Sequence, residues 1–236
     1  MAEKQKVLTK SRALADQLKE TYPKSKYPNR IITDSYLLLM KTINGTFSTI
    51  TFDVLVNQAT GTSANNIENR LQITDRFVVL DHAVAIMKVV TTGTLTPQGD
   101  ISTSTPSTYP NPNVFTAAGE ARALEVMYNS KLSITIDSTV YYQGLDCRRF
   151  YRVPTSQLGT AVSTVATTGV IQRDGWDSLN YAFAPVTENF EFSGIGNNQV
   201  VLNMPDPVNT GGAVGTTNYV LYYARGFQVQ NVNQRQ

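Results

Sequence analysis

The chain has 236 residues and a formal net charge of +2, a length that fits one large all-β domain or two smaller ones. Charged residues make up 16% of it, against about 25% in ordinary soluble domains, and Thr, Ser, Asn and Gln fill the difference. Cys147 is the only cysteine, which excludes an intramolecular disulfide and with it a disulfide-rich secreted scaffold. We find neither the apolar core of a signal peptide nor the ~20 apolar residues of a membrane-spanning helix, so we expect neither general export nor membrane spanning.

The positive charge is concentrated at the N-terminus. Residues 1–30 carry eight Lys and Arg against three Asp and Glu, whereas the rest of the chain carries twelve against fifteen. From Glu3 to about Tyr22 the sequence lacks Gly and Pro, which favours a helix. A connector with two prolines follows. We therefore expect a basic helical arm with its connector over residues 1–29.

The predicted helix is amphipathic, and its two faces indicate different roles. One role is docking of an apolar stripe on the β body, through Val7, Leu14 and Leu18. The other is contact between the basic face and nucleic acid or an anionic lipid surface. The cations available for that contact are Lys4, Lys6, Lys10, Arg12, Lys19, Lys24 and Lys26.

The remainder, residues 30–236, is predicted to form the β body, with a sub-division near 95–117 as an alternative. Ile31–Lys41 and Thr46–Val56 flank Asn44-Gly45, a dipeptide that favours a hairpin turn, and we expect the first of these strands to be buried on both faces. Asp75 to Thr92 supplies two apolar runs, which predict one long bent strand or two consecutive strands.

A long surface excursion and a helix are expected next. Gly93 to Thr116 contains four prolines among Thr and Ser, a composition that disfavours both helices and central strands. Loops of this length are usually functional, and contact with neighbouring molecules is the natural use. Ala117 to Tyr128 favours a helix, with Leu124, Met127 and Tyr128 facing the core.

The clearest β pattern lies in Asn129–Pro154, where Leu, Ile and Ile alternate with Ser, Thr and Asp. We expect a meander of three strands, Leu132–Ile136, Thr139–Tyr142 and Cys147–Val153. Later strands are expected at Glu188–Ser193, Gln199–Met204 and Asn218–Gln230.

The last of these strands, Asn218–Gln230, is apolar on both faces, which is typical of a strand in the middle of a sheet. The whole pattern predicts an all-β fold, a sandwich or jelly roll, with a few short helices.

Residues suited to catalysis are few. His82 is the only histidine, so a multi-histidine metal site is excluded and a Cys147–His82 pair is all that nucleophilic chemistry could use. A buried or edge-strand thiol is the favoured interpretation of Cys147. Carboxylate pairs such as Glu188 and Glu191 lack an aromatic-rich cleft. With no phosphate-binding loop, dinucleotide fingerprint or zinc spacing, we expect no enzyme activity and no cofactor.

Three arginines interleave with aromatic residues in the third strand of the meander. On a strand, Arg148 and Arg152 share one face and Arg149 lies on the other. A row split over two faces suits inter-subunit contacts better than a nucleic-acid surface, which would gather its cations on one face.

The pattern as a whole resembles the jelly-roll capsid proteins of tailless icosahedral bacteriophages, some of which enclose a membrane. The segments that carry the resemblance are LSITIDSTVYYQGLDCRRFYRVPTSQ, ENFEFSGIGNNQVVLNMP and NYVLYYARGFQVQN, together with the basic arm. The resemblance implies a structural protein of the virion, assembled in the host cytoplasm into trimeric or pentameric capsomers. Its partners would be its own copies, other capsid proteins, and membrane lipid or viral genome beneath residues 1–30.

The resemblance also leaves alternatives. A single jelly roll is preferred to a compact double one, because a double jelly roll needs more strands than the sequence predicts. A second function is a phage or bacterial surface glycan-binding β-sandwich, using Trp176, Tyr109 and the long loop. A hydrolase based on Cys147 is the weakest alternative.

Overall fold

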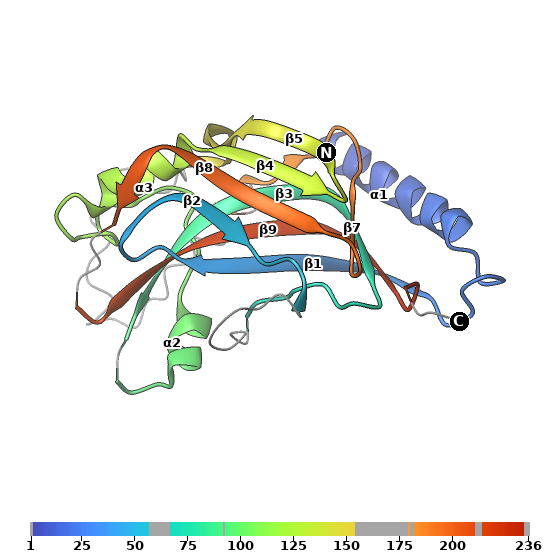
Figure 1. The fold of residues 1–236 in the computed structure, drawn as a ribbon, viewed down its shortest axis with the longest axis horizontal. Helices are drawn as coiled ribbons and strands as arrows, with labels where there is room; N and C mark the ends of the chain where they lie inside the picture. The colour runs from blue at the N-terminus through green and yellow to red at the C-terminus, as the bar shows by residue number, and fades with distance from the viewer. Residues whose placement is uncertain are drawn as a thin grey trace.

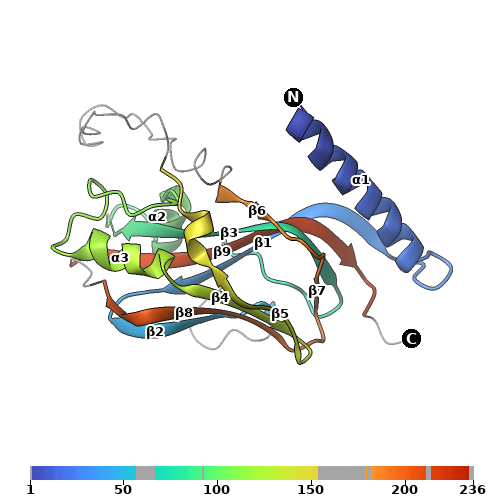
Figure 2. The ribbon, with the colours of Figure 1, turned by 90° about the horizontal axis from the view of Figure 1, so that it is seen from above.

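The protein is an all-β sandwich of two antiparallel sheets (Figures 1 and 2). The structure is a computed structural model that describes residues 2–56, 67–91, 93–153, 179, 182–210 and 214–233, with the backbone alone for 2–10 and 98. The two sheets lie face to face and enclose the main apolar core.

Nine strands fall within the described residues, and they divide between the two sheets by long-range pairing. Sheet A contains, in spatial order, β1 (Ile31–Thr42), β9 (Thr216–Gln230), β3 (Arg76–Val90) and β6 (Ala184–Pro185), and β7 (Glu191–Ser193) also pairs with β3. Sheet B contains, in spatial order, β2 (Thr46–Phe52), β8 (Asn198–Asn209), β4 (Lys131–Ile136) and β5 (Thr139–Asp146).

The helices lie outside the two layers. They are α1 (Ala2–Thr21), α2 (Pro97–Thr103), α3 (Glu120–Tyr128) and the short 3₁₀ helix η2 (Cys147–Phe150). Helix α1 stands beside sheet A, with its N-terminal end pointing away from the strands (Figure 2). Helix α3 covers the opposite end of the sandwich.

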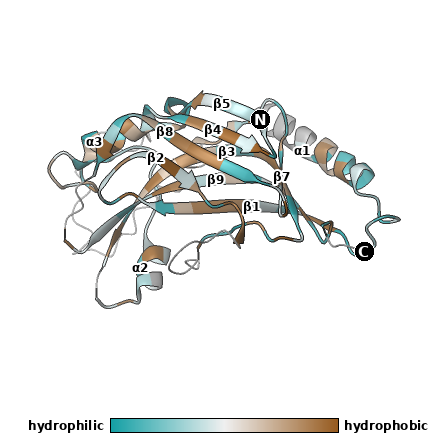
Figure 3. Ribbon diagram, in the orientation of Figure 1, coloured by the Kyte–Doolittle hydropathy of each residue, from teal (hydrophilic) through white to brown (hydrophobic). Residues whose placement is uncertain are grey.

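The core follows from the alternation of side chains along the strands. In β4, Leu132, Ile134 and Ile136 are buried while the residues between them are partly exposed. They face the inner side of sheet A, which contributes Tyr222 and His82, both fully buried. Figure 3 shows the apolar residues, in brown, along strands of both layers. Each sheet thus hides one face against the other.

Strand β9 lies between β1 and β3, which confirms the mid-sheet position expected for the last strand. β3 is one continuous strand, the first of the two predicted alternatives, with a bulge between Val79 and Asp81. At this bulge a Cβ on Gly226 would lie 1.9 Å from the carbonyl oxygen of Val78. Only glycine allows the two backbones to approach this closely.

The predicted hairpin at Asn44-Gly45 is wrong. β1 pairs with β9 in sheet A, and β2 pairs with β8 in sheet B, so the turn carries the chain between layers. Gly45 does have the positive φ of a tight turn, +95°. The Asn44 side chain, however, accepts a hydrogen bond from the backbone N–H of Asn218, which fixes the turn to β9. The burial of β1 on both faces is confirmed over residues 37–40.

The expected surface excursion over 93–116 is also corrected. Helix α2 forms within it, because Thr96 caps the helix through Gly99 and Pro97 occupies the first turn, where a proline costs nothing. Tyr109 and Phe115 are 7% and 2% exposed. Part of the segment therefore packs on the body, while residues 93–97 and 112–114 are exposed at its surface.

Helix α3 follows the prediction closely. Leu124, Met127 and Tyr128 are almost fully buried. The third strand of the predicted meander, in contrast, is the 3₁₀ helix η2. Both Cys147 and Phe150 are buried, a spacing of three that suits a 3₁₀ turn and not a strand.

Candidate functional site

The N-terminal arm is held on the outer face of sheet A by an apolar cluster. Leu14 and Leu18, two of the three residues predicted as the docking stripe, are 5% and 4% exposed. They pack with residues from β3, β9 and the C-terminal segment, namely Val78, Phe227, Val229 and Val232. The third predicted residue, Val7, lies outside the described side chains.

A polar contact fixes the end of the arm next to this cluster. The Tyr22 hydroxyl lies 2.8 Å from both carboxylate oxygens of Glu191, and Arg76 Nη1 donates to the same carboxylate over 2.6 Å. Arg76 Cζ lies 5.8 Å from the centre of the Tyr22 ring. Burial, aided by the bond to Glu191, raises the pKa of Tyr22, so the hydroxyl stays protonated as a donor. The arm is thus bound by both apolar and polar contacts.

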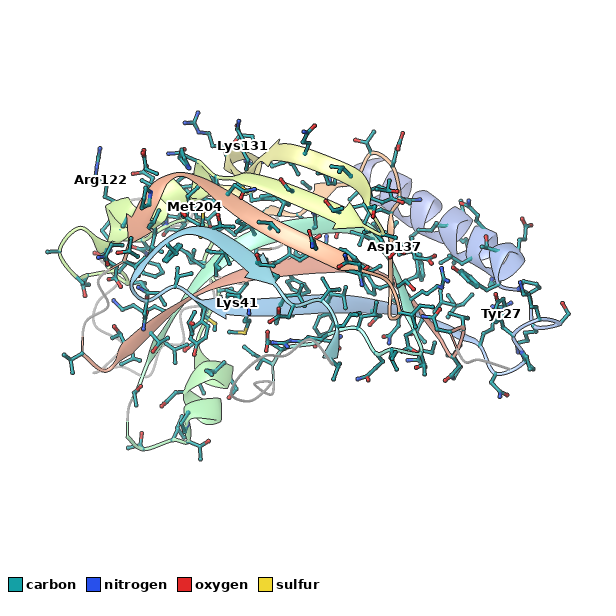
Figure 4. The ribbon with its side chains drawn as sticks, viewed as in Figure 1. Tyr27, Lys41, Arg122, Lys131, Asp137 and Met204 are labelled. Carbon is teal, nitrogen blue, oxygen red and sulfur yellow. The ribbon has the colours of Figure 1, made fainter. Side chains whose placement is uncertain are left out.

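The cations of the arm remain at the surface. Arg12, Lys19, Lys24 and Lys26 are exposed, while Lys4, Lys6 and Lys10 lie outside the described side chains. Lys19 forms an ion pair with Asp16 over 2.6 Å, and this cation lowers the pKa of the Asp16 carboxyl. Figure 4 shows Tyr27, which follows Lys26, at the far end of the molecule. The arm therefore presents positive charge to the outside while its apolar residues face sheet A.

The three arginines predicted as inter-subunit contacts do not lie on a strand. Arg148 and Arg149 belong to η2, Arg152 follows it, and all three are exposed. Arg148 Nε donates to the side-chain oxygen of Asn129 over 2.7 Å. Asp146 caps the turn by accepting from the Arg148 backbone N–H, which explains why the chain leaves the strand here.

Cys147 and His82 are both buried, and both side chains are uncharged at pH 7. Burial raises the pKa of the Cys147 thiol to about 12, so at pH 7 the sulfur is protonated and a poor nucleophile. Burial, with a contribution from Arg149, lowers the pKa of His82 to about 3, so its imidazole is neutral. This state suits side chains of a core better than a reacting pair.

An aromatic shell surrounds His82. Its ring centre lies 5.3 Å from that of Phe150 and 5.7 Å from that of Tyr142. Nδ1 contacts the hydroxyl of Tyr222 over 3.2 Å. Among the described residues Nε2 finds no hydrogen-bond partner. His82 therefore acts as a packed ring of the inter-sheet core.

The residues predicted for glycan binding do not form a described site. Tyr109 is 7% exposed, so its ring face cannot stack on a sugar at the surface. Trp176 lies outside the described residues. The loop that was expected to carry the contact is packed against β3, where Ser107 bonds to the backbone of Ile86.

Sequence reasoning missed a buried ion pair. Lys88 Nζ donates to Glu120 Oε2 over 2.8 Å, and their side chains are 5% and 0% exposed. Glu120 also accepts from Asn218 Nδ2 and from the backbone N–H of Ala117. A lone lysine in an apolar run, VAIMKVV, was the available signal. The cluster connects α3 to β3 and β9.

A second ion pair lies on the outer face of sheet A. Arg225 donates two hydrogen bonds to Asp81, over 2.8 and 2.7 Å, and the two residues are directly opposite in β9 and β3. The guanidinium carbon lies 3.7 Å from the ring centre of Phe183. Asp81 thus joins two neighbouring strands.

No described helix is both long and apolar enough to cross a membrane. The described part of the chain also has no group of three or more His, Cys, Asp or Glu residues placed to hold a metal ion.

Comparison with family models, curated proteins and solved structures finds no match. Function therefore has to be argued from the architecture and the surface.

Proposed function

We propose that this chain is a virion structural protein, a capsid shell component whose body is a single jelly roll. The order of the strands carries the proposal. If β6 and β7 are two halves of one interrupted strand, there are eight strands, and the chain changes layer at every step except from β4 to β5, with β1, β9, β3 and β6/β7 in one sheet and β2, β8, β4 and β5 in the other. Eight strands in two interleaved Greek keys define a jelly roll, a fold common in viral capsids.

The number of strands favours one jelly roll over two. A double jelly roll requires about sixteen strands, and the nine strands of the described residues all belong to one sandwich. The pairing is also long-range: the first and last strands, β1 and β9, lie side by side along their whole length.

The outer face of sheet B supports a role in self-assembly. Where β2, β8 and β4 pair in even register, the outward residues are Thr49, Thr51, Gln199, Val201, Asn203, Lys131, Ser133 and Thr135. One of these eight is charged, whereas a face that meets only water usually carries charges of both signs. An uncharged, polar face is compatible with close contact to copies of the same molecule, since it brings no like charges together.

The arm supports an inward orientation toward something anionic. Its apolar residues are docked on sheet A and its described cations are exposed, so a surface of lipid headgroups or nucleic-acid phosphates could bind it without unfolding the body. Trimeric or pentameric capsomers, other capsid proteins and a place in the virion are parts of the same proposal. We assign no enzymatic role, because the candidate pair Cys147 and His82 is buried and neutral.

Sedimentation velocity over a range of concentrations tests the proposal. The full chain should form discrete oligomers above a threshold concentration, and a variant lacking residues 1–28 should form them with altered size or yield. A chain that stays monomeric at every concentration, with and without the arm, contradicts the proposal.

A further inference from the structure

Strand β5 is an edge strand of sheet B with exposed apolar side chains. Among the described strands it pairs with β4 alone, so its other side has no neighbour in sheet B. In Figure 1 it forms the upper rim of the sandwich. Val140 and Tyr141 in its first half are 55% and 40% exposed.

The chemistry of this edge points to a strand as its partner. Every second residue of an edge strand directs its backbone N–H and C=O groups away from the sheet, and these groups pair best with another extended chain. Proteins normally block such edges with charges, prolines, β-bulges or a covering segment, and of these β5 has an irregular register at two points of its pairing with β4. Residues 139–145, TVYYQGL, contain neither a charge nor a proline.

The other long edges of the described sandwich differ from β5. In sheet A, residue Asn69 forms two backbone hydrogen bonds of 3.0 Å with Leu38 and covers the middle of β1. In sheet B, β2 also lacks charges and prolines, but it exposes no large apolar side chain, whereas β5 exposes Val140 and Tyr141. Within the described part of sheet B, β5 is therefore the edge whose apolar side chains are left uncovered.

We propose that β5 is an assembly edge, which pairs antiparallel with β5 of a second copy across a two-fold axis. An uncharged strand is complementary to itself, because no like charges meet when two copies run in opposite directions. Pairing would join the two four-stranded sheets into one continuous sheet and cover Val140 and Tyr141. The inference rests on the proposed function, and it names the surface through which copies meet.

The charge pattern around the edge supports a second copy of this chain as the occupant. The nearest charged residues, Lys131 and Asp146, lie opposite each other at one end of the β4–β5 pair. The other end is the turn at Asp137 (Figure 4). The charges therefore flank an uncharged centre. A two-fold axis through this centre places Asp146 of each copy near the Asp137 turn of the other and leaves residues 139–145 of both copies to pair without charges.

Substitution of an exposed edge residue by lysine tests the pairing. Val140→Lys places a cation in the apolar part of the edge, where pairing would cover it, and should weaken self-association about tenfold or more. Thr33→Lys, at an exposed position of β1 in sheet A, is the control and should weaken it less. Circular dichroism and thermal unfolding check that both variants fold. If Val140→Lys does not fold, Gln143→Lys serves as the edge variant instead.

Single-cysteine cross-linking tests the geometry. Because Cys147 is buried, Val140→Cys, Tyr141→Cys and Gln143→Cys can be oxidised one at a time in the full chain. Cross-linked dimer should peak at one position and fall at its neighbours, since a disulfide needs a Cα separation of about 4.4–6.8 Å. Uniformly absent cross-links, together with a Val140→Lys variant that assembles as well as the parent, overturn the inference.

These outcomes separate the inference from the proposed function. If the parent forms closed particles and the edge variants form them equally well, the edge is wrong and the capsid proposal stands. If the parent forms only a dimer that never grows, and the edge cysteine variants cross-link that dimer, the edge is right and the capsid proposal fails.

Discussion

Lys88 and Glu120 form an ion pair of 2.8 Å between sheet A and helix α3, in a site where their side chains are 5% and 0% exposed. Glu120 has two further donors, and the Lys88 ammonium lies 5.8 Å from the centre of the Phe115 ring. A buried charge with its partner removed is costly, so this site makes α3 dependent on both residues.

Glu120→Gln should therefore destabilise the fold strongly. It leaves the Lys88 ammonium buried without a carboxylate, which costs about 3–5 kcal/mol in the free energy of unfolding. Urea unfolding followed by circular dichroism measures this loss. The double variant with Lys88→Met should lose less than the two single variants together, because it removes both charges.

The control for this experiment is the exposed pair Lys19–Asp16, with side chains 58% and 64% exposed. Asp16→Asn should leave the unfolding midpoint unchanged. A Glu120→Gln variant as stable as the parent would show that Lys88 finds water or another acceptor.

Acid should destabilise the protein through His82. Its folded pKa of about 3 lies below the value of about 6.5 in an unfolded chain. Below pH 6.5 the unfolded state binds the proton and the folded state does not, so stability falls as the pH drops from about 6.5 to 3, by up to about 1.4 kcal/mol per pH unit. His82→Phe keeps an aromatic ring and should flatten this dependence. Equal pH dependence of parent and variant would contradict the buried neutral state.

Release of the arm should not unfold the body. Leu18→Ala removes a buried side chain from the arm cluster, at a cost of about 2–5 kcal/mol, and this cost falls on the docking of α1. Trypsin should then cut faster at Lys19 and Lys24, while β-sheet circular dichroism stays unchanged. Tyr22→Phe, which keeps the ring but loses the bond to Glu191, should act in the same direction more weakly. Unchanged cleavage in both variants would show that other contacts hold the arm.

The partner of the arm should reveal itself in the salt dependence of binding. Deletion of residues 1–28 should weaken binding to duplex DNA, to vesicles with anionic lipid, or to both, because seven of the twenty Lys and Arg residues are removed. The logarithmic salt slope for DNA should become shallower by about one for each phosphate that the shortened chain no longer neutralises. Vesicles of neutral lipid are the control. Equal binding by the full and the shortened chain would contradict the proposal that the arm binds an anionic partner.

Cys147 should be unreactive in the folded protein. Its thiol is buried and its pKa is about 12, so a thiol reagent at pH 7.5 should label it far more slowly than a free thiol. In urea the rate should rise to that of a free thiol. Fast labelling of the folded chain would show that Cys147 is reactive and would support a nucleophilic role. It would also mean that Cys147 itself reacts in the cross-linking experiment, which requires it to be inert.

Local patterns in the sequence predicted the elements whose burial follows a simple period. The alternation in β4, the two apolar faces of β9 and the helical spacing of Leu124, Met127 and Tyr128 all led to the right element. In each case the side chains that the pattern places on one face are those that the fold buries.

Errors arose where a distant partner or a single side chain decided the outcome. Asn44-Gly45 favours a hairpin locally, yet β9 is the partner of β1 and takes it into the other layer. The Asp146 side chain turns the chain into η2 although the residues that follow suit a strand. Sequence alone could not identify the Lys88–Glu120 pair or the open edge at β5, because both depend on which strands become neighbours.

Negative-stain electron microscopy of the purified full-length chain tests the central claim most directly. For a capsid shell component, we expect closed particles of uniform diameter, or discrete capsomers, in the parent. We expect these particles to be lost in Val140→Lys. Images that show only monomers at high protein concentration would contradict the claim that this protein assembles with its own copies.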